Sequence, residues 1–373
     1  MNNQKRVLGV IDHFGSGGSQ RQFVHLMNGL ANKGYDVSIF TYHASQNFFR
    51  GEIDESNIRI FSTEKKSIGW PGVIRTFVSI ITEVQPAFVI SFLHIPNLLC
   101  EVAGFLTKIR CLVVSERSSR HHDRNLIIGY IRRLLHRRAS KVVVNSKEHG
   151  LWIKKKFPFL GDRIVCIYNG VDPIFFDVSE SKHAGKNVRF VGVGRIDCDK
   201  NPMFLVKALI VFSKKNGWCP SVEWIGRVGH RKKDQRYFES INKLINSNDN
   251  VKASWKWRGE SKEIVKVLAE FNVLIHPSRY EGLPNVVCES LAMGRPVLVS
   301  RVCEHPYLVG ENAERGFLFN LDDPKSLSNK MEKITSMDLV EWEKLTWRCR
   351  AYANNNFRLQ KMVDSFENII RSK

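Results

Sequence analysis

The sequence predicts an α/β protein built from two doubly wound parallel sheets, one in each half of the chain. Its 373 residues exceed what a single hydrophobic core usually supports, and 43% of them are apolar, as in ordinary globular proteins. Short, almost wholly apolar runs alternate with helical segments, which is typical of strands covered by helices on both faces. This pattern starts again after a polar stretch at residues 171–187.

Each half of the chain has its own series of predicted strands. The first series is residues 7–11, 37–41, 88–91, 112–115, 142–145 and 164–168. The second is residues 188–193, 222–225, 273–276, 296–300 and 317–319, with helices at 202–216, 236–246, 263–271 and 285–293. We therefore expect a first domain over residues 1–170, a linker over 171–187 and a second domain over 188–355. A last helix, near residues 356–373, is expected to pack back on the first domain.

The strongest compositional signal is a formal net charge of +20, because a basic surface attracts partners that carry phosphate. Nucleic acid, anionic lipid headgroups and lipid-diphosphate substrates all fit that charge. The eight cysteines include no CxxC pair that would indicate zinc or a redox dithiol. No apolar run is long enough to span a bilayer or resembles a signal peptide, so we expect a protein of the reducing cytoplasm.

The most informative stretch is residues 277–289. A predicted strand ends at Pro277, and after a turn a helix begins near Asn285. Backbone N–H groups at such a helix start favour phosphate oxygens. Glu281 and Glu289 flank that start, and a carboxylate suits sugar hydroxyls better than phosphate because it can accept two hydrogen bonds from a vicinal diol. The stretch therefore predicts a site for a diphosphate joined to a sugar and a ribose.

Five short segments agree in order and spacing with one known family. They are residues 15–18 (Gly-Ser-Gly-Gly), 193–200 (with Arg195 and Lys200), 225–226 (Ile-Gly), 281–289 (an E-x7-E spacing) and 294–297 (Gly-Arg-Pro-Val). Together they resemble glycosyltransferase family 4, the large retaining group of GT-B architecture. The resemblance spans almost the whole chain and implies two Rossmann-like domains that face each other across a deep inter-domain cleft.

The resemblance also implies a role for each matching residue. Arg195 and Lys200 would bind the donor diphosphate and neutralise its charge as it leaves, a task that fixed cations perform without metal. Glu281 would contact the transferred sugar and Glu289 the ribose. The other donor-binding positions implied are Gly17, Gly18, Gly226, Gly282, Leu283, Pro284, Asn285 and Val286. The co-substrate would be a nucleotide-diphosphate sugar, with a UDP-linked hexose or N-acetylhexosamine as the family's usual choice, and no cofactor is implied.

Three residues in the first half are further candidates. His94 follows the strand at residues 88–91, and members of the family often carry a histidine there that contacts the transferred sugar; alternatively it is structural. Glu116 and Arg117 follow the strand at residues 112–115 and are candidates for acceptor binding, although a solvated loop would look the same.

Asp197-Cys198-Asp199 matches the D-x-D string that holds a divalent metal in another glycosyltransferase architecture. Here it lies inside the segment that carries Arg195 and Lys200, where a metal would compete with these cations for the same phosphate oxygens. We therefore interpret the string as coincidental and predict no metal site.

The segment 124–138 is a basic amphipathic helix. Its apolar residues Ile127, Ile131, Leu134 and Leu135 share one face, and Arg124, Arg132, Arg133 and Arg137 lie elsewhere. One interpretation is a helix packed on the core with a wet basic side. The other is a patch that lies on the anionic cytoplasmic face of a membrane, as expected if the acceptor is a lipid-linked glycan of cell-surface polysaccharide or lipopolysaccharide synthesis.

Two other functions fit parts of the pattern. A nucleotide-sugar 2-epimerase shares the architecture and the nucleotide diphosphate, but the arginine–lysine segment and the E-x7-E spacing are not expected of it. A non-catalytic nucleic-acid-binding protein would explain the charge. However, the sequence shows neither zinc-finger spacing nor an aromatic RNA-binding string nor a basic tail, so nucleic acid is not an expected partner.

Overall fold

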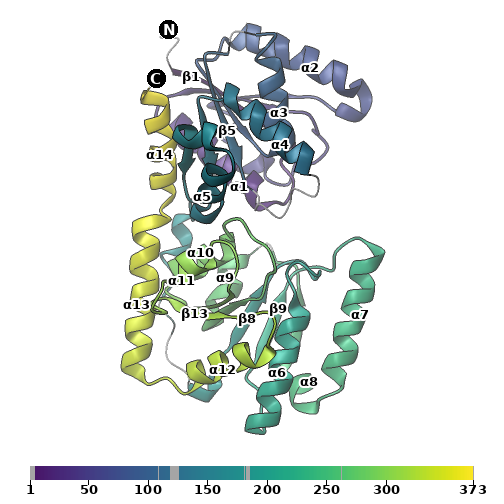
Figure 1. Ribbon diagram of the computed structural model, residues 1–373, viewed down its shortest axis with the longest axis vertical. Coiled ribbons are helices and arrows are strands. Elements are labelled where there is room, and N and C mark those ends of the chain that lie inside the picture. The colour runs from purple at the N-terminus through teal and green to yellow at the C-terminus, as the bar shows by residue number, and fades with distance from the viewer. Residues whose placement is uncertain are drawn as a thin grey trace. The chain divides into compact units, whose positions relative to one another are not determined.

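The structure is a computed structural model that describes residues 5–107, 109–117, 126–179, 181, 185–261 and 263–372. The chain divides into two compact units (Figure 1). The first unit is Met1–Gly170 with Leu359–Lys373, and the second is Val171–Arg358. Each unit is described by itself below.

The described residues of the first unit form a seven-stranded sheet with the order β3-β2-β1-β4-β5-β6-β7, and every neighbouring pair is parallel. The strands are β1 (Arg6–Ile11), β2 (Asp36–Thr41), β3 (Ile58–Ser62), β4 (Phe88–Phe92), β5 (Cys111–Glu116), β6 (Lys141–Val144) and β7 (Ile164–Cys166). The chain reverses its direction of travel across the sheet between β1 and β4. Such a switch point in a doubly wound sheet is the usual place for a ligand.

Helices cover both faces of this sheet. They are α1 (Gly18–Asn32), α2 (Lys65–Val84), α3 (His94–Ala103), α4 (Leu126–Leu135), α5 (Lys147–Lys156) and α14 (Leu359–Arg371). The described residues of this unit also form the short 3-10 helices η2 (Arg50–Glu52), η4 (His136–Arg138) and η5 (Pro158–Arg163), and those of the second unit form η6 (Pro173–Phe175) and η7 (Gly185–Asn187). On one face α1 and α14 pack together, with the Phe366 ring stacked on Phe92 at a centroid distance of 6.1 Å. The other face is covered by α2, α3 and α5.

The second unit repeats the same winding. Its described residues form a six-stranded parallel sheet with the order β10-β9-β8-β11-β12-β13. The strands are β8 (Phe190–Val193), β9 (Val222–Ile225), β10 (Trp255–Gly259), β11 (Val273–His276), β12 (Val297–Ser300) and β13 (Gly316–Phe319). Here the switch point lies between β8 and β11.

The helices of the second unit begin and end where the sequence supplies caps. They are α6 (Pro202–Asn216), α7 (Lys232–Asn246), α8 (Asp249–Ser254), α9 (Ile264–Ala269), α10 (Asn285–Ala292), α11 (His305–Val309), α12 (Pro324–Thr335) and α13 (Leu339–Asn356). The side chains of Asp323 and Asp338 accept N–H bonds in the first turns of α12 and α13, and Gly217 ends α6 in the left-handed region. A single core around Trp224 and Phe212 joins these helices to the sheet.

The predicted fold class of two doubly wound parallel sheets is confirmed. Two strands are additional to the prediction, β3 and β10, and both lie at an outer edge of their sheet. The predicted linker corresponds to a stretch that contains η6 and η7, and within it residues 180 and 182–184 lie outside the described residues.

Candidate active site

Three loops meet at the carboxyl edge of the second sheet, at its switch point. The loop after β8 accepts a hydrogen bond at Asp199 O from the backbone N–H of Arg279, which follows β11 (2.8 Å). The Ile196 N–H donates to Arg227 O after β9 (2.8 Å). The loops that carry Arg195, Lys200 and residues 277–289 are therefore one hydrogen-bonded assembly.

Gly194 and Gly226 are required where these loops cross. Gly226 has φ +146°, and a Cβ there would lie 2.1 Å from the Gly194 carbonyl oxygen. The Trp224 Nε1–H donates to that same oxygen at 2.9 Å and fixes its position. At Gly194 itself a Cβ would lie 3.0 Å from Lys200 Cγ, so the lysine side chain passes directly over the glycine. The predicted glycine at 226 thus shapes the loops that carry the site.

Lys200 and Glu281 form an ion pair at the centre of this edge, although 81 residues separate them in the sequence. The lysine side chain keeps 26% of its surface exposed and the glutamate 12%. A lysine has three N–H donors, so pairing with one carboxylate oxygen leaves donors for a further acceptor. The structure therefore brings together two of the residues that the sequence predicts to act together.

A buried histidine, His276, forms a hydrogen bond with Glu281. The His276 Nε2 lies 2.9 Å from Glu281 Oε1 and 3.0 Å from Ser278 Oγ. Burial lowers the pKa of His276 although Glu281 opposes this, so the ring is neutral near pH 7 and donates its Nε2–H to the carboxylate. Burial alone would raise the pKa of Glu281, but the Lys200 charge and the His276 hydrogen bond hold it well below its ordinary range.

Buried residues next to His276 form a second set of hydrogen bonds. The His305 ring packs edge-on against His276 with a centroid distance of 5.5 Å, and its Nδ1 lies 2.7 Å from Ser300 O. Burial lowers the pKa of His305 to about 3, so this ring also stays neutral. The Ser300 hydroxyl donates to Ser278 O at 2.5 Å and links β12 to the loop after β11. His276 was not among the predicted site residues; its signal was a polar residue that ends an otherwise apolar strand.

Arg195 lies at the same edge with 59% of its side chain exposed, and its NH2 is 3.2 Å from Asp197 Oδ2. Asp197 is buried and its Oδ1 accepts the backbone N–H groups of Asp199 (3.1 Å) and Lys200 (2.9 Å). The first aspartate of the D-x-D string thus closes the loop that presents Lys200. Among the described residues, no group of three or more His, Cys, Asp or Glu side chains is arranged to hold a metal ion.

The second glutamate of the E-x7-E spacing is on α10. This helix begins at Asn285 behind Pro284, as predicted, and its first turn presents backbone N–H groups at the sheet edge. Gly282, Asn285 and Val286 are partly exposed, whereas Leu283, Pro284 and Glu289 are buried. The predicted donor-binding positions 282–286 and 289 therefore lie in the loop before α10 and in the first two turns of that helix, beside Glu281.

In the first unit, the loop after β1 leads directly into α1 at that sheet's switch point. Gly17 is the N-cap residue and Gly18 the first helical residue. A Cβ on Gly17 would lie 2.1 Å from Oε1 at the end of the Gln20 side chain, so a larger residue there requires Gln20 to shift. The Gln22 side chain exchanges two 2.8 Å hydrogen bonds with the backbone of Gly170 and fixes α1 against the end of this unit.

His94 follows β4, on the other side of the same switch point. It is the first residue of α3 and is partly exposed. Leu93 before it has φ +77°, a conformation that is costly for a residue with a side chain. Buried Asn97 holds this turn, because its Oδ1 lies 2.7 Å from Ser91 Oγ and its Nδ2 donates to Ser115 O at 3.0 Å. The fold thus presents His94 at the carboxyl edge, where its predicted role remains a prediction.

Glu116 ends β5 but lies in the interior. Its side chain has no exposed surface, and its oxygens accept hydrogen bonds from His136 Nε2 (2.9 Å), His149 Nε2 (2.9 Å) and Arg133 NH2 (3.1 Å). His136 also pairs with buried Glu101. Burial would raise the pKa of Glu116, but these partners hold it well below its ordinary range. The structure thus gives Glu116 an interior role, and its geometry does not support the predicted acceptor contact.

Arg117 is also turned inward. Its guanidinium lies 4.0 Å from the Phe92 ring centroid, and its NH1 donates to Asn169 Oδ1 at 2.6 Å. Burial lowers the pKa of Arg117 to about 9. The adjoining residues 118–125 lie outside the described residues. An acceptor contact by Arg117 is therefore still a prediction, and it requires the side chain to become accessible.

The outer face of α4 is apolar, so of the two interpretations open from the sequence, the one that packs this face on the core is wrong. The exposed large side chains are Ile127, Ile128, Tyr130, Ile131 and Leu134. Arg133 is buried on Glu116, and Arg132 Nε lies 3.4 Å from a Glu116 oxygen. The isoleucines lie on the outside because the buried carboxylate of Glu116 draws the arginines inward. Arg137, after α4, is exposed, and Arg124 lies outside the described residues.

Comparison with known proteins identifies the class. Residues 16–175 match a family described as Glycosyltransferase Family 4, and residues 187–337 match one described as Glycosyl transferases group 1. Together with the two doubly wound units, these matches define a glycosyltransferase of the GT-B architecture. The chain belongs to glycosyltransferase family 4, as the sequence resemblance implied.

Two bacterial enzymes illustrate the similarity in sequence. The chain is 27% identical over 339 residues to a Campylobacter jejuni alpha-1,4-N-acetyl-D-galactosaminyltransferase whose named acceptor is a diNAcBac-PP-undecaprenol glycan, with 87% of each chain covered. It is 28% identical over 216 residues to an Escherichia coli UDP-Gal:alpha-D-GlcNAc-diphosphoundecaprenol alpha-1,3-galactosyltransferase, a match that covers 56% of this chain and only 54% of the enzyme.

Solved structures share the fold along the whole chain. A glycosyltransferase from Rickettsia africae superposes with a TM-score of 0.83 at 18% identity, covering 100% of this chain and 99% of the other. The Anabaena protein HepE, solved with UDP and glucose, gives a TM-score of 0.81 at 17% identity, covering 99% of this chain and 100% of the other. Within the described part of the chain, no helix combines the length and apolarity needed to cross a bilayer.

Proposed function

We propose that this enzyme transfers a sugar from a nucleotide diphosphate, with UDP the expected carrier, to a lipid-linked glycan, with retained anomeric configuration and without a metal ion. The observation that carries the proposal is the group formed by Lys200, Glu281 and His276 beside Arg195 and the start of α10. It combines fixed cations and helix N–H groups for a diphosphate with a held carboxylate for sugar hydroxyls.

Each part of the donor is proposed to bind a different part of this group. The diphosphate takes the exposed Arg195 guanidinium, the remaining Lys200 donors and the N–H groups between Gly282 and Val286. Glu281 keeps Lys200 and His276 on one oxygen, Oε1, so its other oxygen can accept from the transferred sugar. Glu289, on α10, receives the ribose hydroxyls. For Gly17, Gly18 and His94 of the first unit, a role in donor binding is proposed from the family resemblance alone.

The proposed reaction breaks the bond between the anomeric carbon and the diphosphate oxygen on one face of the sugar. Negative charge then develops on the diphosphate, where Arg195 and Lys200 stabilise it without needing to move. The acceptor hydroxyl attacks the same face, and its proton passes to the leaving phosphate oxygen. No side chain forms a covalent intermediate, because Glu281 is held for a distal hydroxyl by two donors.

The two matched bacterial enzymes support the acceptor class. Both are named for acceptors joined to undecaprenol through a diphosphate, and the HepE structures hold UDP or UDP-glucose. We therefore propose a UDP-sugar donor and a diphosphate-linked polyprenyl glycan acceptor, in a pathway that builds a cell-surface glycan.

A donor panel tests the chemistry. Purified protein is incubated with UDP-hexoses and UDP-N-acetylhexosamines, with and without EDTA, and free UDP is measured. We expect slow hydrolysis of one donor, unchanged by EDTA, and faster UDP release with an undecaprenyl-diphosphate-linked sugar. A strict requirement for added metal would contradict metal independence, and conversion of the donor to an epimer without acceptor would indicate an epimerase.

The stereochemistry has its own test. With an α-linked UDP-sugar, proton NMR of the product should show an α linkage. A β linkage, or a glycosyl group trapped on a side chain and seen by mass spectrometry, would contradict the proposed front-face mechanism.

We further propose that α4 attaches the enzyme to an anionic membrane surface. Its exposed isoleucines provide the apolar contact, and Arg137 with neighbouring basic residues provides attraction worth on the order of 1 kcal/mol per charge. Co-sedimentation with phosphatidylglycerol vesicles should fall in Ile127→Ser/Ile131→Ser, whereas Leu339→Ser/Val340→Ser, an equally exposed pair on α13, should bind like wild type. Wild-type protein that stays in the supernatant at low salt would end this proposal.

A further inference from the structure

The loop after β9 and the start of α7 concentrate positive charge at the carboxyl edge of the second sheet. Residues 227–236 (the basic segment) contain five arginines and lysines and a single acid, Asp234. All five basic side chains are exposed: Arg227, Arg231, Lys232, Lys233 and Arg236. Unbalanced charge of this kind sets up a positive potential in the surrounding solvent, which attracts anions.

Asp234 is already committed within the basic segment. Its buried carboxylate accepts the backbone N–H of Arg231 (3.2 Å) and two donors of the Arg231 guanidinium (2.8 and 3.0 Å). Lys232, Lys233 and Arg236 (the outer cations) form no ion pair with any acid in the described part of the chain. The charge of the outer cations is therefore directed to solvent.

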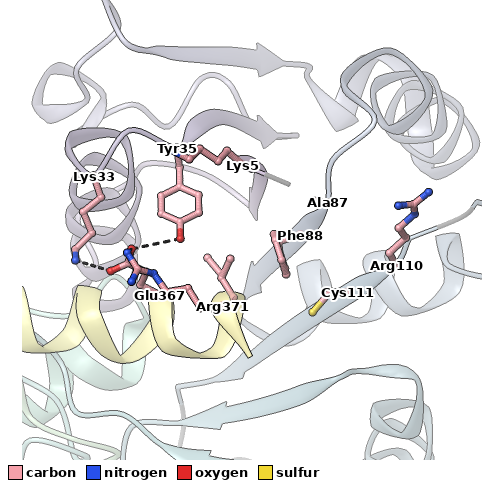
Figure 2. A pocket seen from close by; sticks show the side chains of 10 residues that line it. Lys5, Lys33, Tyr35, Ala87, Phe88, Arg110, Cys111, Glu367 and Arg371 are labelled. Carbon is pink, nitrogen blue, oxygen red and sulfur yellow. Dashed lines mark hydrogen bonds and ion pairs between the residues drawn. The ribbon is translucent and has the colours of Figure 1, made fainter. Parts of the chain in front are cut away.

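Cations that hold the fold together are paired with acids, as at the amino edge of the first sheet (Figure 2). There Glu367 on α14 accepts from Lys33 Nζ (2.5 Å), from Arg371 NH2 (2.7 Å) and from the Tyr35 hydroxyl (3.3 Å). Lys33 is also 2.6 Å from Asp364, so two cations and two carboxylates balance each other and join α14 to α1. The outer cations of α7 differ, because their charge does not serve such a structural pairing.

The outer cations also oppose the dipole of the helix that carries them. Free N–H groups give the start of a helix partial positive charge, so cations at this end weaken the helix. Lys232 and Lys233 are the first two residues of α7, and Arg236 lies in its second turn. Breaks in such a local rule are expected where residues serve function rather than stability.

Hydrogen bonds tie both ends of the basic segment to the loop after β8. The Ile196 N–H donates to Arg227 O at 2.8 Å, and the Tyr237 hydroxyl lies 3.4 Å from Asn201 Oδ1. Asn201 directly follows Lys200, one of the two cations proposed to bind the donor diphosphate. The positive potential of the basic segment therefore acts beside the proposed donor site.

We propose that the outer cations attract the nucleotide diphosphate through solvent and guide it to the donor site, without contacting it once it is bound. This inference rests on the proposed function, because it needs an anionic donor at this edge. Charges act over roughly 30 Å at about 0.01 M salt but over only about 3 Å at about 1 M. Guidance through solvent is therefore lost in salt, whereas a direct contact persists.

Isothermal titration calorimetry with UDP, at about 0.02 M and about 0.5 M NaCl, tests the range of this attraction. For Lys232→Gln/Lys233→Gln/Arg236→Gln we expect the Kd for UDP to rise about five- to tenfold at the lower salt concentration. At the higher concentration the rise should be less than about twofold, because the charges are screened. Glutamine has nearly the helix propensity of lysine and arginine, so α7 is retained.

A matched control removes the same charge from the other end of the second unit. Lys214, Lys243 and Lys252 are exposed near the carboxyl ends of α6, α7 and α8, which lead back to the amino edge of the sheet. Lys214→Gln/Lys243→Gln/Lys252→Gln should change the Kd less than about twofold at both salt concentrations, because these charges are farther from the donor loop.

Three results would overturn the proposal. A rise in Kd that persists at the higher salt concentration would show that the outer cations contact the nucleotide, and equal shifts in the test and control variants would show that net charge alone acts. Unchanged UDP affinity with lost binding of a single-stranded oligonucleotide would assign the basic segment to nucleic acid. These results leave the proposed donor site in place, whereas wild-type protein that binds no UDP at either salt concentration contradicts that site and this inference with it.

Discussion

Glu116 in the first unit and Glu281 in the second have almost the same kinds of partner. Glu116 follows the last apolar residues of β5, and Glu281 lies in the loop after β11; each has a histidine Nε2 at 2.9 Å and a basic side chain. Their exposure differs. Glu116 and its partner Arg133 have 0% and 1% of their side-chain surface exposed, whereas Glu281 and Lys200 keep 12% and 26%.

This difference separates a scaffold from a binding site. At Glu116, two histidines and two arginines leave the carboxylate no surface for a ligand, so the charges hold β5, α4 and α5 together. At Glu281, the same chemistry sits at a switch point where solvent reaches both charges. Depth in the sheet, rather than residue type, decides which glutamate can act on a substrate.

Neutralising the two glutamates gives the largest expected contrast in stability. Glu116→Gln leaves Arg133 and His136 buried without their counter-charge, and we expect the free energy of unfolding to fall by about 3–5 kcal/mol. Glu281→Gln should cost less than about 1 kcal/mol, because its partner can turn to solvent. Urea denaturation followed by circular dichroism measures both. Equal losses in the free energy of unfolding would show that the two carboxylates contribute equally to stability.

Removing the cation at the exposed group should affect turnover rather than folding. For Lys200→Ala we expect kcat to fall about 10²-fold or more, comparable to the loss of one preorganised donor to a developing anion. Lys207→Ala on α6 removes an exposed lysine of the same unit and is the matched control. UDP release from the preferred donor gives the rate. If Lys200→Ala keeps more than half of the wild-type rate, Lys200 does not stabilise the leaving diphosphate.

The buried group should also make stability depend on pH. Burial would lower the pKa of His136, but its hydrogen bonds to Glu101 and Glu116 outweigh this and raise it from 6.5 to about 9. A raised folded pKa contributes stability that is complete below about pH 6.5 and is lost as the pH rises through 9. We expect a loss of roughly 2 kcal/mol across that window. The loss should be absent in His136→Gln; a wild-type urea midpoint that stays constant from pH 6.5 to 9 would exclude a charged His136.

The central strands could be predicted from sequence because they are covered on both faces and read as continuous apolar runs. The two strands that were missed are edge strands. In β3 and β10 only the first residue is buried and a charged residue interrupts the apolar ones, as in Trp255-Lys256-Trp257-Arg258, so they lack that signal.

The site was predictable where residue spacing reflects chemistry. Lys200 and Glu281 were expected to act on one ligand, and the structure pairs them. His276 was missed because a histidine at the end of an apolar strand is more often structural. The sequence left open which face of α4 lies inside, because periodicity cannot show that a buried carboxylate, Glu116, lies opposite Arg133. Long-range charge pairing of this kind becomes visible only with the fold.

The smallest of these effects tests whether His276 positions Glu281. We expect His276→Ala to lower kcat about tenfold, the value of one hydrogen bond to a charged group, with little change in KM for the donor. Without this donor the pKa of Glu281 rises from its lowered value, so the acid limb of the pH–rate profile should move to higher pH. Glutamine can place an N–H near the position of Nε2, so His276→Gln should restore much of the rate and return the acid limb toward wild type. A purely structural histidine would instead lower stability in both variants and leave the limb in place, because Lys200 alone would then set the charge of Glu281.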